Sequence, residues 1–175
     1  MILAVDIGNT NIVVGCVDGE KILFRERIST NHTATDLEYA TTFKMALNMH
    51  DLKASDVDGA IISSVVPSVT NTVKKAIEKY ANVKVMVVGP GIKTGLSIMI
   101  DNPAQLGSDL VVGAVAGING YSVPQIIIDM GTATTITVVD EGNRFVGGAI
   151  IPGVAISMNA LSSGTSLLQK VPLDA

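Results

Sequence analysis

Short apolar runs near the start of the chain are separated by turn residues, a pattern typical of β-strands. Two runs cover residues 2–5 and 12–17, and a third expected strand, residues 21–27, carries the apolar residues 22–24 between charged ones; glycine, asparagine and aspartate lie between the three segments. Strands joined by such short turns pair antiparallel. The pattern predicts a β-meander at the start of the chain.

A change of periodicity after the meander predicts helices between further strands. Thr35 and Glu38 have the spacing of a capping box and predict the start of a helix. Apolar residues at helical spacing predict a second helix over residues 69–80, and the apolar runs 59–66 and 83–88 predict buried strands. Together with the meander, these elements predict a mixed sheet.

One phrase occurs twice along the chain. DIGNT at residues 6–10 and DMGTA at residues 129–133 each follow an apolar run with an aspartate, place a glycine two residues later and lead into a second apolar run. A helix predicted to start at Asn102-Pro103 precedes the second copy, and a helix predicted over residues 154–161 follows its strands. Such self-similarity indicates an internal repeat.

The repeat predicts an α/β protein with a duplicated fold, each copy built on a mixed five-stranded sheet. The second copy has no counterpart of residues 59–88 before the sequence ends, so we expect it to be incomplete in this chain. We accordingly expect a first domain over residues 1–117 and the start of a second domain over residues 118–175.

Composition narrows the class of protein. Hydrophobic residues make up 47% and charged residues 16% of the chain, which suits a globular core rather than disorder. The uncharged run 110–128 contains polar residues, glycines and Pro124, so it predicts a helix, a loop and a strand instead of a membrane span. No secretory leader is visible at the start, which favours a cytoplasmic location.

Charge and cysteine content exclude several kinds of site. The net charge is −4 and no dense cluster of lysine and arginine occurs, which argues against nucleic-acid or membrane partners. Cys16 is the sole cysteine, so an intramolecular disulfide and a cysteine metal cluster are excluded, and we expect a packed thiol. A small-molecule partner fits these features better.

The repeated phrase carries the candidate chemistry. A strand that ends on Asp6 or Asp129 and then turns at a glycine presents a carboxylate and several backbone N–H groups at one sheet edge. Hydroxyl and amide side chains in both loops add uncharged hydrogen-bonding groups. One copy alone is explained as an ordinary hairpin turn, whereas two copies facing each other predict a nucleotide cleft.

The two loops lack basic side chains. Residues 1–20 and 126–143 contain neither lysine nor arginine. A polyphosphate bound by these loops would therefore need cations to offset its charge. Mg²⁺ held by Asp6 or Asp129, directly or through water, is the expected supply.

Asp109 is a further candidate acid. Its neighbours at positions 106 and 110–112 are apolar, a setting in which a carboxylate takes up a proton more readily. It could then accept the proton of an alcohol that attacks a phosphate group. A solvated aspartate stabilised at the start of a helix explains the same residue equally well from the sequence alone.

Four motifs in order resemble a known family. They are DIGNT at residues 6–10, NPAQLGSD at 102–109, DMGTATT at 129–135 and GGAIIPGVAISMNAL at 147–161. Together they resemble the type III pantothenate kinases, members of the superfamily that joins actin, heat-shock chaperone ATPases and sugar kinases. The resemblance implies a duplicated ribonuclease H-like fold, the fold of the actin-like ATPases.

The resemblance also implies an activity. It implies that ATP phosphorylates the 4′-hydroxyl group of pantothenate, the first step towards coenzyme A, in a cytoplasmic homodimer that needs Mg²⁺ and K⁺ or NH₄⁺. Two alternatives stay open: a non-catalytic ATP-binding regulator on the same fold, and a phosphohydrolase in which Asp109 activates water.

Site residues follow from the resemblance position by position. It implies that Asp109 is the catalytic base, that Asp129 binds the monovalent cation and that residues 147–153 border the adenosine. The expected ATP-binding residues are Asp6, Ile7, Gly8, Asn9, Thr10, Asn11, Ile12, Val13 and Thr132. The expected substrate-binding residues are Gly107, Ser108, Asp109 and Leu110.

Two positions depart from the family pattern. The family often has an arginine that contacts pantothenate where this chain has Leu110, and commonly a tyrosine where it has Ile100. Loss of a charge-assisted contact to the substrate carboxylate would cost about 1.5–3 kcal/mol unless another group replaces it. The family's chain also continues past the position of Ala175 and supplies a further threonine contact to the substrate.

Overall fold

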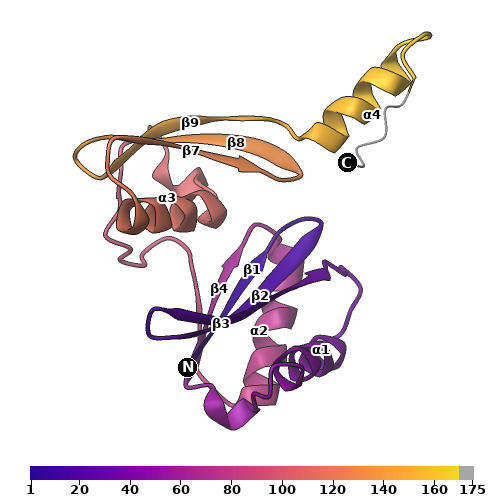
Figure 1. Ribbon diagram of the computed structural model, residues 1–175, viewed down its shortest axis with the longest axis vertical. Helices are drawn as coiled ribbons and strands as arrows, with labels where there is room; N and C mark the ends of the chain where they lie inside the picture. The colour runs from indigo at the N-terminus through magenta and orange to yellow at the C-terminus, as the bar shows by residue number, and fades with distance from the viewer. Residues whose placement is uncertain (170–175) are drawn as a thin grey trace. The chain divides into compact units, whose positions relative to one another are not determined.

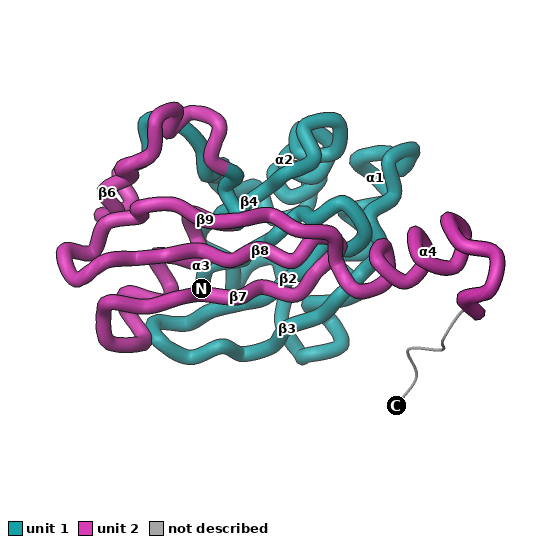
Figure 2. Tube along the Cα trace, turned by 90° about the horizontal axis from the view of Figure 1, so that it is seen from above, with its two compact units in different colours: residues 1–92, 107–109 teal, residues 93–106, 110–175 magenta. Residues whose placement is uncertain are grey.

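The computed structural model describes residues 1–169, which form two compact units. Figure 2 colours the two units along the chain. They consist of residues 1–92 with 107–109, and of residues 93–106 with the described chain from residue 110 onward. Helix α3 (Ser108–Gly120) crosses this division, because its first two residues belong to the first unit.

The first unit is built on a five-stranded mixed sheet, as the sequence predicts (Figure 1). Its strands are β1 (Ile2–Ile7), β2 (Asn11–Asp18), β3 (Lys21–Ser29), β4 (Gly59–Ser64) and β5 (Val85–Val87). The spatial order is β3-β2-β1-β4-β5. The predicted meander is confirmed, since β1, β2 and β3 pair antiparallel, while β4 lies parallel to both β1 and β5.

Two helices of the first unit pack against each other, namely α1 (Asp36–Asn48) and α2 (Pro67–Ala81). The predicted capping box is present: the Thr35 side chain accepts from the Glu38 amide at 3.3 Å, and the Glu38 carboxylate accepts from the Thr35 amide at 2.7 Å. These bonds satisfy amide groups that a helix start otherwise leaves without partners. A short 3₁₀ turn, η1 (Ala54–Asp56), precedes β4.

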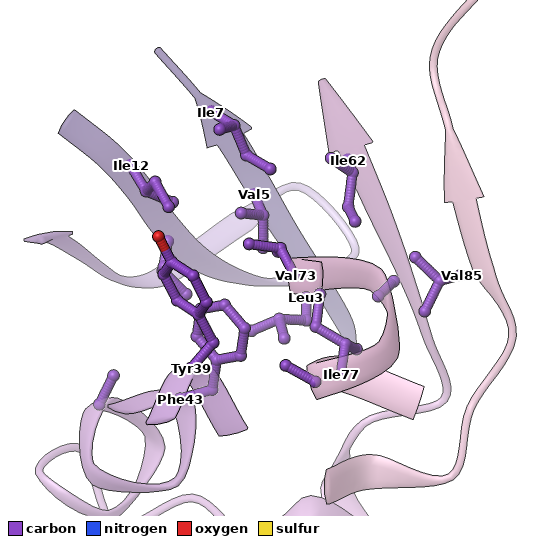
Figure 3. Packing of buried hydrophobic residues seen from close by; sticks show 14 of the residues in the cluster. Leu3, Val5, Ile7, Ile12, Tyr39, Phe43, Ile62, Val73, Ile77 and Val85 are labelled. Carbon is purple, nitrogen blue, oxygen red and sulfur yellow. The ribbon is translucent and has the colours of Figure 1, made fainter. Parts of the chain in front are cut away.

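The core of the first unit lies between one face of the sheet and the two helices. Alternate residues of β1, namely Leu3, Val5 and Ile7, are buried there, and Figure 3 shows them in one cluster with Phe43 of α1. Cys16 belongs to the same core, which confirms the expected packed thiol. Each fully buried side chain of this kind contributes about 1.5–3 kcal/mol relative to an exposed one.

The second unit contains a four-stranded sheet. Its elements are β6 (Ser97–Ile98), η2 (Pro103–Gln105), α3, β7 (Gln125–Met130), β8 (Ala133–Val139), β9 (Arg144–Pro152) and α4 (Val154–Gly164). The strand order is β6-β9-β8-β7, in which β7, β8 and β9 pair antiparallel and β6 lies parallel to β9. The predicted second meander is therefore confirmed, whereas the duplication of a complete fold stays a prediction.

The predicted start of the long helix at Asn102-Pro103 is wrong. These residues open only the three-residue turn η2, and Leu106 then takes an extended conformation, with φ −69° and ψ 124°. A helix cannot continue through an extended residue, so α3 begins anew at Ser108. This break places Asp109 in the first turn of α3.

One face of the second sheet packs against α3. The small core there comprises Ala114, Val139 and Phe145, with partly buried hydrophobic residues around it. Helix α4 follows β9 and buries none of its residues. Among residues 1–169, no helix is long and apolar enough to cross a membrane.

Candidate functional site

The first repeated phrase forms a tight loop between β1 and β2. Asp6 lies opposite Val13, and the last pair of the ladder joins Ile7 and Ile12. The intervening first loop, residues 8–11, is closed by a hydrogen bond of 2.9 Å from the Gly8 amide to the Asn11 carbonyl. A side chain at Gly8 would press on that carbonyl, with a Cβ only 3.1 Å from it, so glycine suits the turn.

The expected ATP-binding residues of this segment differ in what they can offer a ligand. Ile7 and Ile12 are fully buried in the core, so only their backbone groups are available to a ligand. Asp6, Asn9 and Thr10 are exposed, and they combine a carboxylate with an amide and a hydroxyl group. Gly8, Asn11 and Val13 are partly buried.

A row of cross-strand partners extends from Asp6 to both sides of the sheet. Asp6 pairs with Ser63 of β4 and with Val13 of β2, and Val13 pairs in turn with Arg27 of β3. Direct partners in a sheet project from the same face. The exposed Arg27 therefore shares a face with Asp6, opposite the face that carries the core.

Arg27 is the residue that the charge argument from the sequence missed. It lies outside residues 1–20, yet the sheet brings it into the row of Asp6. Neighbouring strands lie about 4.8 Å apart, so two strand spacings separate the backbones of Arg27 and Asp6, roughly 10 Å. Only the pairing of β2 with β3 could have found it, because nothing in the local sequence sets this register.

The start of α3 is fixed to the end of β4 by the hydroxyl group of Ser108. This hydroxyl accepts from the Ser64 amide at 2.9 Å, donates to the Ser64 carbonyl at 2.9 Å and lies 3.3 Å from the Ser63 hydroxyl. Ser63 is the register partner of Asp6. The structure thus brings Asp6 and the 107–109 segment to the carboxyl ends of two adjacent parallel strands, where open α/β sheets bind ligands.

Asp109 occupies the next position of α3 and is partly buried. Its carboxylate lies over Gly107, where a Cβ atom would overlap the Oδ1 atom of Asp109. Asp109 is also the acidic residue of the first turn of α3, where the helix dipole favours a negative charge. Both interpretations of Asp109, as a catalytic base and as a helix-start acid, fit this position.

The second repeated phrase forms a similar loop between β7 and β8. Asp129 lies opposite Thr135, and the Gly131 amide donates to the Ala133 carbonyl at 3.0 Å. The second loop, residues 131–133, is one residue shorter than the first loop, residues 8–11. Asp129 and Thr132 are both exposed.

The end of β9 closes on the second loop. The Gly153 amide donates to the Thr132 carbonyl at 3.1 Å. A Cβ atom on Gly153 would fall well inside van der Waals contact with the carbonyl oxygens of Gly131 and Thr132, so only glycine permits this approach. The last residue of the expected adenosine segment thus supports the second loop.

The two departures from the family pattern share one environment. Leu110 and Ile100 both pack, partly buried, against the cluster of Ala114, Val139 and Phe145. Leu110 thus contributes apolar packing at the position where a substrate contact is expected. Leu110 lies beside these hydrophobic residues of the second unit.

The donor atoms around Asp6 and Asp129 suit hard cations. Each aspartate is followed by a loop with an exposed hydroxyl group, Thr10 after Asp6 and Thr132 after Asp129, and carboxylate and hydroxyl oxygens are ligand atoms that Mg²⁺ and related ions prefer. Among residues 1–169, no group of three or more His, Cys, Asp or Glu side chains gathers to hold a metal. Each cation would therefore rely on one carboxylate together with neutral oxygens and water, an arrangement that Mg²⁺ tolerates well.

The nearest basic residue in sequence to the second loop is already paired. Arg144 binds Asp140 at 2.7 Å across the turn between β8 and β9. The Arg144 guanidinium lowers the pKa of the Asp140 carboxyl group. This turn lies at the opposite end of β8 from the second loop, so Arg144 does not supply a positive charge to that loop.

Comparison with known protein families gives a match over residues 2–175 to the family described as type III pantothenate kinase. The type III pantothenate kinase of Geobacillus sp. (strain WCH70) is 46% identical over 173 residues, which are 99% of this chain and 67% of that protein. The enzyme of Exiguobacterium sp. (strain ATCC BAA-1283 / AT1b) is 45% identical over the same share of this chain and 68% of its own length. The chain thus spans about two thirds of these relatives.

Solved structures share the fold at low sequence identity. The ethanolamine utilization protein EutJ of Carboxydothermus hydrogenoformans matches with a TM-score of 0.53 and 15% identity, over 93% of this chain and 56% of that one. A protein of Sinorhizobium meliloti described as a 2-dehydro-3-deoxygalactonokinase matches with a TM-score of 0.57 and 13% identity, over 95% of this chain and 58% of that one. These likenesses support the α/β fold of actin-like ATPases and sugar kinases.

Proposed function

The chain belongs to the type III pantothenate kinase family, and from this premise we propose that it transfers the γ-phosphoryl group of ATP to the 4′-hydroxyl group of pantothenate. This reaction is the first step towards coenzyme A. One structural observation carries the proposal beyond family membership. Ser108 ties the start of α3 to β4, which brings the Asp109 segment to the strand ends that also hold Asp6 and the first loop.

Asp109 is the proposed base. As the hydroxyl oxygen of pantothenate attacks the γ-phosphorus atom, the Asp109 carboxylate takes up the hydroxyl proton. The bond from the γ-phosphorus to the oxygen that bridges to the β-phosphate breaks, and ADP leaves. Gly107 leaves room for the carboxylate, and the 107–110 segment borders the acceptor.

The first loop and Asp6 bind the phosphates of ATP in this proposal, together with Thr132 of the second loop. Mg²⁺ near Asp6 and a monovalent ion, K⁺ or NH₄⁺, near Asp129 supply the positive charge that the loops lack. The exposure of both carboxylates, each next to a loop with hydroxyl side chains, supports these assignments. Arg27, in the row of Asp6, adds a protein charge on the same sheet face.

Dependence on the acceptor tests the proposed reaction. Release of ADP should require pantothenate, and Asp109→Asn should reduce it about a thousandfold while ATP binding persists, because the amide cannot take the proton. The matched control is Asp101→Asn, which changes an exposed aspartate before η2. Release of ADP without pantothenate would instead identify a phosphohydrolase, and ATP binding without any turnover would identify a regulator.

The proposal includes a homodimer in the cytoplasm, which rests on family membership. Sedimentation of the intact protein at micromolar concentration should give twice the mass of one chain. A monomer under these conditions would contradict the assembly without affecting the proposed chemistry.

A further inference from the structure

Thr30, the residue after β3, holds the first loop by two hydrogen bonds. Its hydroxyl donates to the Gly8 carbonyl at 2.6 Å, and its amide donates to the Thr10 carbonyl at 3.0 Å. Both distances are those of well-formed hydrogen bonds. One residue thus occupies two carbonyl groups of a loop that is proposed to bind phosphate.

The orientation of these carbonyls determines what the loop presents to an anion. The peptide between Gly8 and Asn9 is trans, so its N–H group points away from its C=O group. Because the Gly8 carbonyl points to Thr30, the Asn9 amide points to the opposite side. A loop with its carbonyls turned towards a phosphate would repel it, whereas a loop with its amides turned that way binds it.

Thr30 is itself held by a buried part of the core. The Tyr39 hydroxyl accepts from the Asn31 amide at 3.0 Å and donates to the Asn31 carbonyl at 2.8 Å. Tyr39 is 3% exposed and stacks on Phe43, and Figure 3 shows its hydroxyl directed towards Ile12 at the start of β2. The Tyr39 hydroxyl of α1 therefore fixes the backbone of Asn31, the residue immediately after Thr30.

We propose that Thr30 is a positioning residue for ATP, which holds the first loop so that the Asn9 amide faces the phosphate groups. The inference rests on the proposed function, because it assigns the first loop to ATP. Thr30 acts through the loop and does not itself contact the nucleotide. No motif in the sequence identifies Thr30, because its two partners lie about 20 residues earlier.

Three variants test this role by their affinity for ATP with Mg²⁺, measured by titration calorimetry on the intact protein. Thr30→Val keeps the shape but removes the hydroxyl, and should weaken ATP binding about tenfold, the effect of one misplaced donor to a charged group. Thr30→Ser keeps the hydroxyl and should stay within about threefold of wild type. The matched control is Thr42→Val, which removes a hydroxyl that donates to the Glu38 carbonyl at 2.9 Å within α1.

Adenosine, which has no phosphate, separates positioning from general damage. Thr30→Val should bind adenosine as wild type does, and its KM for ATP should rise about tenfold while its KM for pantothenate stays within about twofold. Equal ATP affinity in Thr30→Val and wild type would overturn the role of Thr30 alone. Equal losses for ATP and adenosine would overturn it too, and a wild-type protein that binds no ATP would overturn the proposed function along with it.

Discussion

The inner face of β1 and the matching face of β7 carry the same kind of side chain but lie in opposite environments. Aligning the repeated phrases matches Asp6 with Asp129. The residues three before, one before and one after each aspartate therefore correspond. The exposed fractions in β1 are 0% for Leu3, 3% for Val5 and 0% for Ile7. Those of the matching residues in β7 are 67% for Ile126, 61% for Ile128 and 69% for Met130.

The difference comes from helices rather than from strands. In the first unit α1 and α2 cover this face, whereas in the second unit α3 packs on the other face and α4 buries none of its residues. Both strands nevertheless form an antiparallel hairpin that turns at a glycine, with a loop one residue shorter in the second unit. The loop geometry therefore depends on the local pairing of two strands, and burial depends on what packs on the sheet.

The largest effect is expected at Asp6, the aspartate before the first loop, which corresponds to Asp129 before the second loop. Asp6→Asn should reduce ATP turnover about a thousandfold with an unchanged melting temperature, because a neutral amide cannot hold the Mg²⁺ that the first loop requires. ADP release at saturating Mg²⁺ measures the rate. Asp18→Asn, at the other end of β2, is the control and should leave turnover unchanged. Normal turnover in Asp6→Asn would remove Asp6 from the site.

Matched truncations in the two strands test the difference in burial. Leu3→Ala should lower the free energy of unfolding of the first unit by about 2–5 kcal/mol, since it leaves a cavity in a packed core. Ile126→Ala removes a similar side chain that is exposed and should change stability by about 0.5 kcal/mol or less. Urea unfolding followed by circular dichroism measures both. A large loss for Ile126→Ala would mean that its face is covered in solution.

Monovalent cations should distinguish the second loop from the first. Replacing K⁺ by Na⁺ at constant ionic strength and saturating Mg²⁺ should reduce turnover about thirtyfold. The reason is that residues 126–143, which include the second loop, contain no basic side chain to offset the charge of the phosphates. Asp129→Asn should abolish the response to K⁺, while Asp140→Asn, an aspartate paired with Arg144, should keep it. The same rate in every monovalent salt would contradict both the Asp129 assignment and the charge argument.

The smallest effect is expected at Arg27, the basic residue that shares the row of Asp6 in the first unit. Arg27→Gln should raise the KM for ATP about fivefold, as expected for an exposed charge that acts on phosphates through solvent. Arg25→Gln changes an equally exposed arginine whose register partner is Gly15, one row further from Asp6, and should stay within about twofold. Steady-state kinetics at two salt concentrations measures both variants. Equal effects would indicate general electrostatics rather than the row of Asp6.

Much of this protein followed from local patterns in the sequence. The meanders, the capping box at Thr35, the buried Cys16 and the two loops at Asp6 and Asp129 all appear where the pattern predicts them. The meanders, the capping box and the loops depend on residues close together in the chain, such as a turn glycine or a capping threonine. The motifs around these loops also predicted the family that the comparisons support.

Only the tertiary structure decided which distant residues meet. The register of β2 with β3 placed Arg27 beside the row of Asp6, and the end of β3 placed Thr30 on the first loop. The hydroxyl of Ser108 fixed the start of α3, which the sequence predicted too early. The apolar runs of β1 and β7 are alike in the sequence, but the packing of α1 and α2 buried only the matching face of β1, because burial is a property of the partner surface and not of the strand.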